Sequence, residues 1–243
     1  MTLPVPKELG AELSGILERD VRINIHASPV SVWTAEGKVV LDGKVENIIA
    51  KRVALARAQQ LVGDRWPILD LLRVVPGEPK EDLALRDEVV SALTKEPVFT
   101  DHSLRTKTGG EVRVIQDAGP GASEIEATIH NGSATLAGRV GSLTHRRLAE
   151  VLVWWTAGCE AVHNQLEVVP PQEDNDNEIT DAVRIVLEKD PLVHASQLRV
   201  GTAGGVVVLS GSLASTEEKR LAVLDAWYVP GIWDVVDHIE VRS

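Results

Sequence analysis

Three pairs of glycines, each pair separated by nineteen residues, divide this sequence into three copies of one unit. The pairs are Gly43 and Gly63, Gly138 and Gly158, and Gly211 and Gly231. Other positions keep the same register: a leucine two residues before the first glycine, two basic residues eight and nine after it, and an alanine eleven after it. Self-similarity at a fixed spacing is the signature of repeated structural units. We therefore expect three small domains of one fold.

The third copy shows the order of elements most clearly. Apolar residues three to four apart predict a helix over 178–189, with Asn177 as its cap. Ser215 and Glu218 have the spacing of a capping box that opens a second helix. Strands are expected at 197–200, 206–213 and 232–241. The sequence therefore predicts an α+β protein of three tandem αββαβ domains, each a three-stranded sheet covered on one face by two helices.

Short linkers that follow the same Val-Val-Pro ending separate the copies. The expected domains are copy one (1–76, the most divergent), copy two (81–170) and copy three (177–243). Copy two carries an insertion at about 98–124, where alternating residues between glycine-rich turns predict an added hairpin or a flexible flap. In copy one, segments 22–26 and 30–34 compete for the first strand.

The formal charge is −11 at pH 7, which disfavours nucleic acid as a partner because both would be strongly negative. The chain opens without a basic segment followed by an apolar run, and no stretch is apolar over a bilayer's thickness. The single cysteine, Cys159, forms no internal disulfide, which fits a reducing compartment. These features predict a cytoplasmic protein and leave its oligomeric state open.

Neither a catalytic nor a metal-ligand pattern is evident. The seven histidines are scattered without ligand spacing. The acidic run 174–177 begins like a calcium loop, but Ile179 stands where glycine is required and Ile185 where the terminal glutamate is required. We expect a protein that is not an enzyme and holds no cofactor or metal.

The ends of copies two and three resemble the BON domain, a bacterial module found in osmotically induced and envelope-associated proteins. The resemblance rests on Val207–Gly211, on Gly231–Val241 and on Gly158–Val168, which carries the family's asparagine at Asn164. Copy one matches more loosely. The resemblance implies attachment to phospholipid surfaces or envelope structures and no catalytic residues.

Two kinds of residue are candidates for such a surface: the repeated basic pairs, and the aromatic residues that close two of the late helices. The candidates are Lys51, Arg52, Arg146, Arg147, Trp154, Trp155, Lys219, Arg220, Trp227 and Tyr228. Basic residues attract anionic lipid, and amphipathic rings suit headgroup regions. Two alternatives stay open: the cations pair with nearby glutamates such as Glu217 or Glu218, and the rings pack in the core or between copies.

The candidate function is therefore reversible attachment to a membrane or envelope surface. The alternative is a soluble protein adaptor or an ion-responsive module that acts through the open sheet faces or the copy-two insertion. Salt dependence separates the two, because lipid docking through cations weakens steeply as salt rises.

Overall fold

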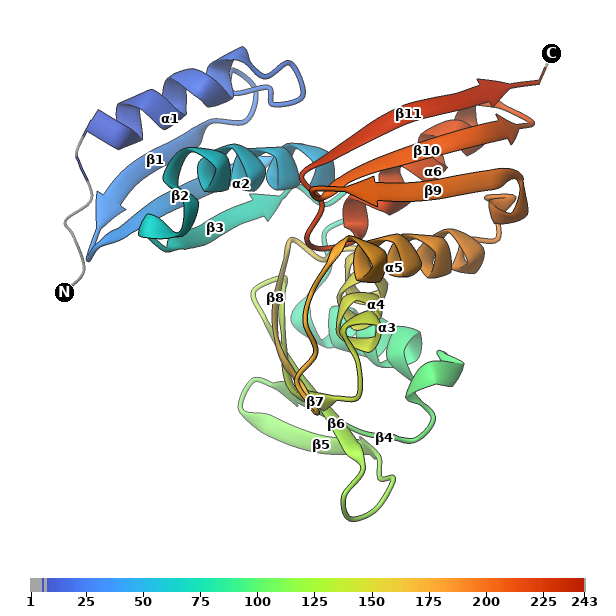
Figure 1. Cartoon of the computed structure of the whole chain (residues 1–243). Helices are drawn as coiled ribbons and strands as arrows, with labels where there is room; N and C mark the ends of the chain where they lie inside the picture. Colours follow the sequence, from blue (N-terminus) through green and yellow to red (C-terminus); the bar gives the residue numbers. More distant parts are fainter. Residues whose placement is uncertain (1–5, 7, 243) are drawn as a thin grey trace. The chain divides into compact units, whose positions relative to one another are not determined.

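A computed structural model of the chain describes residue 6 and residues 8–242. The chain forms two compact units: residues 1–75 with 232–234, and residues 76–231 with 235–243. Copy one belongs to the first unit. Copy two and nearly all of copy three belong to the second (Figure 1).

Copy one folds in the predicted order of helix, strand, strand, helix and strand. Its elements are α1 (Glu8–Arg19), β1 (Val30–Ala35), β2 (Lys38–Val45), α2 (Ile48–Val62) and β3 (Ile68–Val74). The first strand is therefore Val30–Ala35 and not 22–26. β1 pairs antiparallel with β2, and α2 carries the chain across to β3, which pairs parallel with β2. A parallel pair needs such a crossover, and here the crossover is a helix.

Copy two has the same order with the insertion resolved as a hairpin. Its elements are α3 (Asp82–Thr94), β4 (His102–Thr108), β5 (Glu111–Gln116), β6 (Ser123–His130), β7 (Ser133–Val140), α4 (Leu143–Trp154) and β8 (Ala161–Val168). The hairpin β4–β5 joins the sheet through a parallel pairing of β4 with β6. The sheet therefore has five strands in the order β5-β4-β6-β7-β8, where three were predicted.

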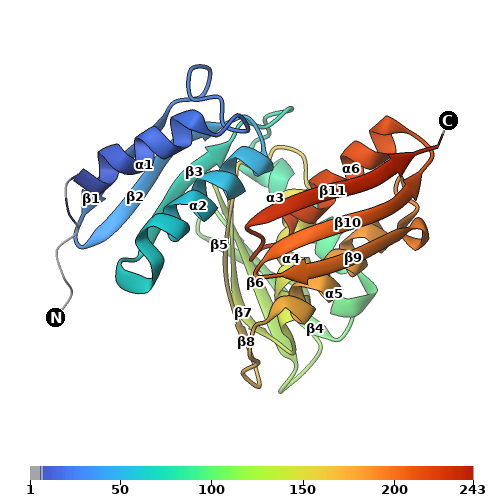
Figure 2. The same ribbon diagram turned by 45° about the horizontal axis from the view of Figure 1, so that its top comes forward.

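Copy three is the most regular of the three. Its elements are α5 (Asp176–Lys189), β9 (Leu198–Ala203), β10 (Val206–Leu213), α6 (Thr216–Tyr228) and β11 (Asp234–Val241). The strands lie in the order β11-β10-β9, and Figure 2 shows both helices behind this sheet. The cap of α5 is Asn175 and not Asn177, because the Asn175 side chain accepts hydrogen bonds from the backbone N–H groups of Asn177 and Glu178. The predicted α+β fold of αββαβ repeats is confirmed.

The first glycine of each copy is required by a close approach of two strands. The backbone φ angles of Gly43, Gly138 and Gly211 are +139°, +124° and +138°. A Cβ at any of these positions would overlap a carbonyl oxygen at the start of the neighbouring strand or just before it, those of Pro29, Glu124 and Gln197 respectively. Only glycine combines this backbone conformation with the absence of a Cβ. The first glycine of each pair therefore recurs for the same structural reason in all three copies.

The late helices lie close to their sheets along a stripe of small residues. The stripe consists of Ala54 and Ala58 in α2, Ala149 and Val153 in α4, and Ala222 and Ala226 in α6, all fully buried. Four residues after the first glycine of each pair lies the cap of the helix, whose side chain accepts a backbone hydrogen bond: Asn47, Ser142 and Ser215. The eighth residue after each first glycine is thereby fixed in the first turns of a helix that faces the last strand of its sheet.

Candidate functional site

The eighth position carries a lysine in copies one and three, and both lysines are neutralised within their own copy. Lys51 Nζ lies 2.6 Å from Asp70 Oδ2 and donates a 2.6 Å hydrogen bond to the carbonyl oxygen of Leu72. Lys219 Nζ lies 3.0 Å from Asp237 Oδ2 and donates a 2.6 Å bond to the carbonyl oxygen of Ile239. Each aspartate comes from the last strand of its sheet.

The two lysines differ in how deeply they are buried. The Lys51 side chain is 3% exposed, whereas that of Lys219 is 29% exposed. The ion pair of Lys51 with Asp70 is therefore more shielded from water than that of Lys219 with Asp237, and losing one partner of a buried pair is costly.

Copy two has Asn164 where the other copies have aspartate, and the difference removes the partner. The Asn164 amide donates to the backbone oxygen of Arg146 at 2.8 Å and to Glu150 Oε2 at 3.2 Å. Its own oxygen accepts from the Leu166 N–H, as Asp70 and Asp237 accept from Leu72 and Ile239. The backbone geometry of the slot is therefore conserved among the copies, but its negative charge is lost.

Arg146 occupies the eighth position of copy two and therefore faces an amide and not a carboxylate. Among the described residues its guanidinium makes no ion pair or side-chain hydrogen bond, and it is half-buried. An arginine stays charged at any physiological pH and presents a planar set of donors that matches a phosphate or a carboxylate. It is the member of the predicted set that is best placed to meet an anion.

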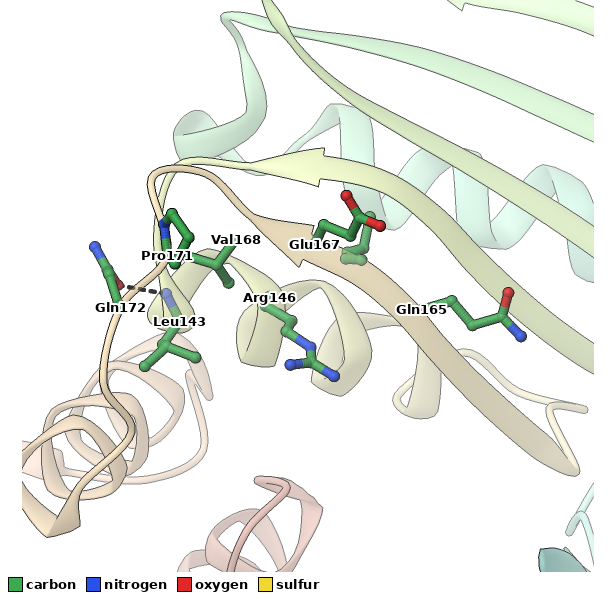
Figure 3. Close-up of a pocket in the computed structure, with 8 residues that line it drawn as sticks. Leu143, Arg146, Gln165, Glu167, Val168, Pro171 and Gln172 are labelled. Atoms are coloured by element: carbon green, nitrogen blue, oxygen red, sulfur yellow. Dashed lines mark hydrogen bonds between the residues drawn. The ribbon is translucent and has the colours of Figure 1, made fainter.

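A cavity of about 420 Å³ lies beside Arg146, between the start of α4, strand β8 and the segment that leaves β8 (Figure 3). It is lined by Leu143, Arg146, Gln165, Leu166, Glu167, Val168, Pro171 and Gln172. Gln172 Oε1 accepts a 3.0 Å bond from the Leu143 N–H, which holds the Gln172 side chain beside the start of α4. The cavity combines one cation, one carboxylate, two amide side chains and an apolar wall.

Glu167 lines this cavity but does not neutralise Arg146. In Figure 3 the carboxylate of Glu167 and the guanidinium of Arg146 lie on opposite sides of the β8 ribbon. The register explains this, because Glu167 pairs with Arg139 on the sheet face away from the helices. Within the part of the chain that the structure describes, the guanidinium of Arg146 therefore stays unpaired although a carboxylate also lines this cavity.

The arginine at the ninth position has different partners and a different exposure in each copy. Arg147 is 4% exposed and holds both carboxylate oxygens of Asp174 at 2.7 Å, while its Nε donates to the carbonyl oxygen of Pro230. Arg220 is exposed and pairs with Glu217. Arg52 is half-buried and has partners of its own. Arg147 thus joins copies two and three, and Asp174 of the supposed calcium loop is used for this purpose.

The four aromatic residues at the ends of the late helices differ in how deeply they are buried. Trp154 and Trp227 are buried and pack inside the protein, whereas Trp155 and Tyr228 are half-buried. Burial raises the pKa of the Tyr228 hydroxyl, and the nearby Asp225 raises it further. Within the predicted set a ligand can therefore reach Arg146, Lys219, Arg220, Trp155 and Tyr228 more readily than Lys51, Arg147, Trp154 or Trp227.

One cluster was missed from the sequence. The rings of Phe99, His102 and His145 lie 5.2 to 6.1 Å apart in copy two, with edge-to-face geometry. Burial lowers the pKa of both histidines, and for His102 the charge of His145 adds to the effect. Both rings are therefore neutral at pH 7. Two of the three residues belong to the insertion, which has no counterpart in the other copies.

The described residues include no group of three or more His, Cys, Asp or Glu side chains placed to hold a metal ion. Asp176, the other carboxylate of the acidic linker, accepts the N–H groups of Gly204 and Gly205. Among the helices of residues 8–242, none has the length and apolar character to cross a bilayer.

Comparison with known proteins identifies one family. The BON domain model matches residues 100–170 and 175–243, which together make up more than half of the chain. No curated protein matches. Among solved structures, two of CdsD, a structural protein of the type III secretion system of Chlamydia trachomatis, are similar at 15% identity. The first, its C-terminal domain, matches over 98% of this chain and 100% of that chain with a TM-score of 0.26; the second over 97% and 92% with 0.25. Scores this low carry no argument about this chain.

Proposed function

This chain belongs to the BON domain family, and from that premise we propose that it is a non-enzymatic binding protein that attaches reversibly to anionic phospholipid surfaces through Arg146. The observation that carries the proposal is the unpaired Arg146 guanidinium beside a cavity of about 420 Å³. The chain would act in the cytoplasm, at the periphery of a membrane or envelope structure.

The physical basis is the match between guanidinium and phosphate. Arginine binds phosphate oxygens through two parallel charge-assisted hydrogen bonds, which are stronger than neutral ones. Each cation near an anionic surface also contributes about 1 kcal/mol. The net charge of −11 opposes docking, so one unpaired cation supports weak, reversible attachment and not permanent anchoring.

Co-sedimentation with vesicles tests the proposal. The full chain is mixed with anionic and with neutral vesicles at low and at physiological salt, beside two variants. Arg146→Gln removes the unpaired cation, and Arg220→Gln removes one that is already paired with Glu217. We expect binding to anionic vesicles that weakens with salt, is lost in Arg146→Gln and is nearly unchanged in Arg220→Gln.

Two results would count against lipid attachment. One is the absence of binding to anionic vesicles at both salt concentrations. The other is equal binding by the wild-type chain and Arg146→Gln, which would mean that another surface makes the contact. Binding of inorganic phosphate without binding of vesicles would assign the site to a free anion.

A second candidate function is a protein adaptor, and the open sheet face of copy one favours it. Trp33 and Leu69 lie on either side of the buried Val40 on this face, in register across β1, β2 and β3. Trp33 and the neighbouring Leu71 are 40% and 41% exposed. Crosslinking in cells, comparing the wild-type chain with a Trp33→Ser, Leu71→Ser variant, tests it: a partner bound by Arg146→Gln but not by the double variant would favour the adaptor.

A further inference from the structure

Strand β5 of the inserted hairpin lies at the outer edge of the five-stranded sheet in copy two (Figure 1). In the described part of the chain it pairs with β4 on one side and with no strand on the other. An edge strand offers a row of unpaired backbone N–H and C=O groups to any extended segment that approaches it. β5 is therefore a place where another strand can be added.

The charged side chains of β5, Glu111 and Arg113, pair with each other, and none of its residues is a proline. Val112 and Val114 are 54% and 63% exposed, and both lie on one face of the strand. Proteins usually block an exposed edge with a charge that points inward, a proline or a bulge. Here a bulge occurs only at the far end, because Leu104 pairs with Gln116 while Arg105 pairs with Val114, which leaves Ile115 unpaired. The segment from Glu111 to Val114 remains regular and open.

We propose that β5 pairs antiparallel with β5 of a second copy of this chain, in a register centred on Val112. This register places Glu111 of each copy opposite Arg113 of the other, so that both charges are matched twice across the two-fold axis. On the opposite face it brings the Val112 side chains together, with Val114 diagonal to them. Opposite-charge pairs and β-branched pairs across strands both stabilise a sheet.

The charge of β5 distinguishes a second copy from other occupants. Its one acidic and one basic side chain, Glu111 and Arg113, are exposed and lie 2.9 Å apart within the strand. The strand is therefore locally neutral, although the whole chain carries −11. Two copies repel each other overall, and salt screens that repulsion. Pairing through β5 is thus expected to strengthen as salt rises, the opposite of lipid docking through Arg146.

Analytical ultracentrifugation of the full chain, over a range of concentrations and at two salt concentrations, tests the pairing. We expect the wild-type mass to rise from one chain toward two, with at least a tenfold loss of association in Val112→Lys, because this variant places two like charges directly opposite each other. Leu83→Lys is the matched control: it introduces the same charge on an exposed leucine of α3 in the same copy. Circular dichroism verifies that each variant is folded.

A charge-exchange experiment tests the register. Glu111→Arg alone and Arg113→Glu alone each place like charges opposite each other in a homodimer, so each is expected to stay monomeric. Mixed together they match again, because two arginines of one chain face two glutamates of the other, and association should return.

The proposal is overturned if the wild-type chain stays monomeric at all concentrations, if Val112→Lys associates as the wild type does, or if the mixed variants fail to associate. A monomeric chain whose vesicle binding is lost in Val112→Lys would also overturn it, by assigning the edge to lipid. Because these readouts do not involve Arg146, failure here leaves the vesicle experiment unaffected.

Discussion

Copies one and two place the same kind of residue at the same point of the fold and obtain different chemistry from it. Lys51 is buried against Asp70, so its charge serves stability. Arg146 stands opposite a neutral amide, Asn164, so its charge remains available. The difference lies in the partner on the last strand and not in the cation. A basic residue that recurs in a repeat is therefore not evidence of a recurring function.

Copies one and three differ in a similar way at a second position, fourteen residues after the first glycine. In copy one Arg57 lies there and pairs with Asp20 at the end of α1. With the stronger help of Arg22, this holds the pKa of Asp20 well below its usual range. In copy three the position is Asp225, which faces Asp190 at the end of α5. Burial, and then the charge of Asp190, raises the pKa of Asp225 to about 8.

The largest expected effect is on the pH dependence of stability. The pKa of Asp225 rises from 3.8 to about 8 on folding, so between these values the folded state binds more protons than the unfolded state. The stability that this group contributes is fully present below pH 4 and is lost as pH rises through 8, by up to about 1.4 kcal/mol per pH unit. Denaturant unfolding from pH 4 to 9 should show this decline in the wild type and a flatter profile in Asp225→Asn. A profile as steep in the variant would contradict the assignment.

The next effect concerns Lys51. Asp70→Asn removes the carboxylate that lies 2.6 Å from its buried ammonium, and the loss of one partner of a buried ion pair costs about 3 kcal/mol. Hydrogen exchange of peptides from α2 and β3 measures the loss within the first unit. The matched change in copy three, Asp237→Asn, serves as the control because Lys219 is more exposed. Equal losses at the two positions would show that burial does not separate the two lysines.

Asn164→Asp makes copy two resemble its neighbours. The new carboxylate lies where Asp70 meets Lys51, so it should pair with Arg146 and lower affinity for anionic vesicles about tenfold, which corresponds to about 1.4 kcal/mol. Folding stability should fall by about 1 to 3 kcal/mol, because the new carboxylate cannot donate to the Arg146 carbonyl oxygen and lies beside the buried Glu150 carboxylate. Unchanged vesicle binding in this folded variant would separate Arg146 from the lipid site.

The smallest effect is the converse change in copy three. Asp237→Asn frees Lys219, which is expected to raise affinity for anionic vesicles about twofold while lowering stability by about 1 kcal/mol. Vesicle titrations of this variant beside Glu217→Gln, which instead frees Arg220, show whether the slot or merely the added positive charge matters. A larger gain from Glu217→Gln would favour charge alone.

The fold was predictable from the sequence because its determinants are local. Glycine spacing, caps and the stripe of small residues each act over a few residues, and the repeat displays them three times. The sequence repeat aligns Asn164 with Asp70 and Asp237. It does not show that these residues contact the eighth position, because that contact joins a helix to a strand. The signal in the sequence was that copies one and three combine a lysine with an aspartate at these two positions, whereas copy two combines an arginine with an asparagine. The carboxyl pair of Asp190 and Asp225 had no such signal, because its chemistry depends on burial.

The slot that holds Asn164 also has an evolutionary consequence. Asparagine and aspartate have nearly the same shape, and in all three copies the side-chain oxygen keeps the same backbone hydrogen bond. Exchanging one for the other requires a change at one base of the codon and almost no change in side-chain volume, although in copy two it removes the two hydrogen bonds that the Asn164 amide donates. After duplication, a copy could therefore gain or lose an open cation by a single mutation, while the backbone bond that holds the slot stayed the same.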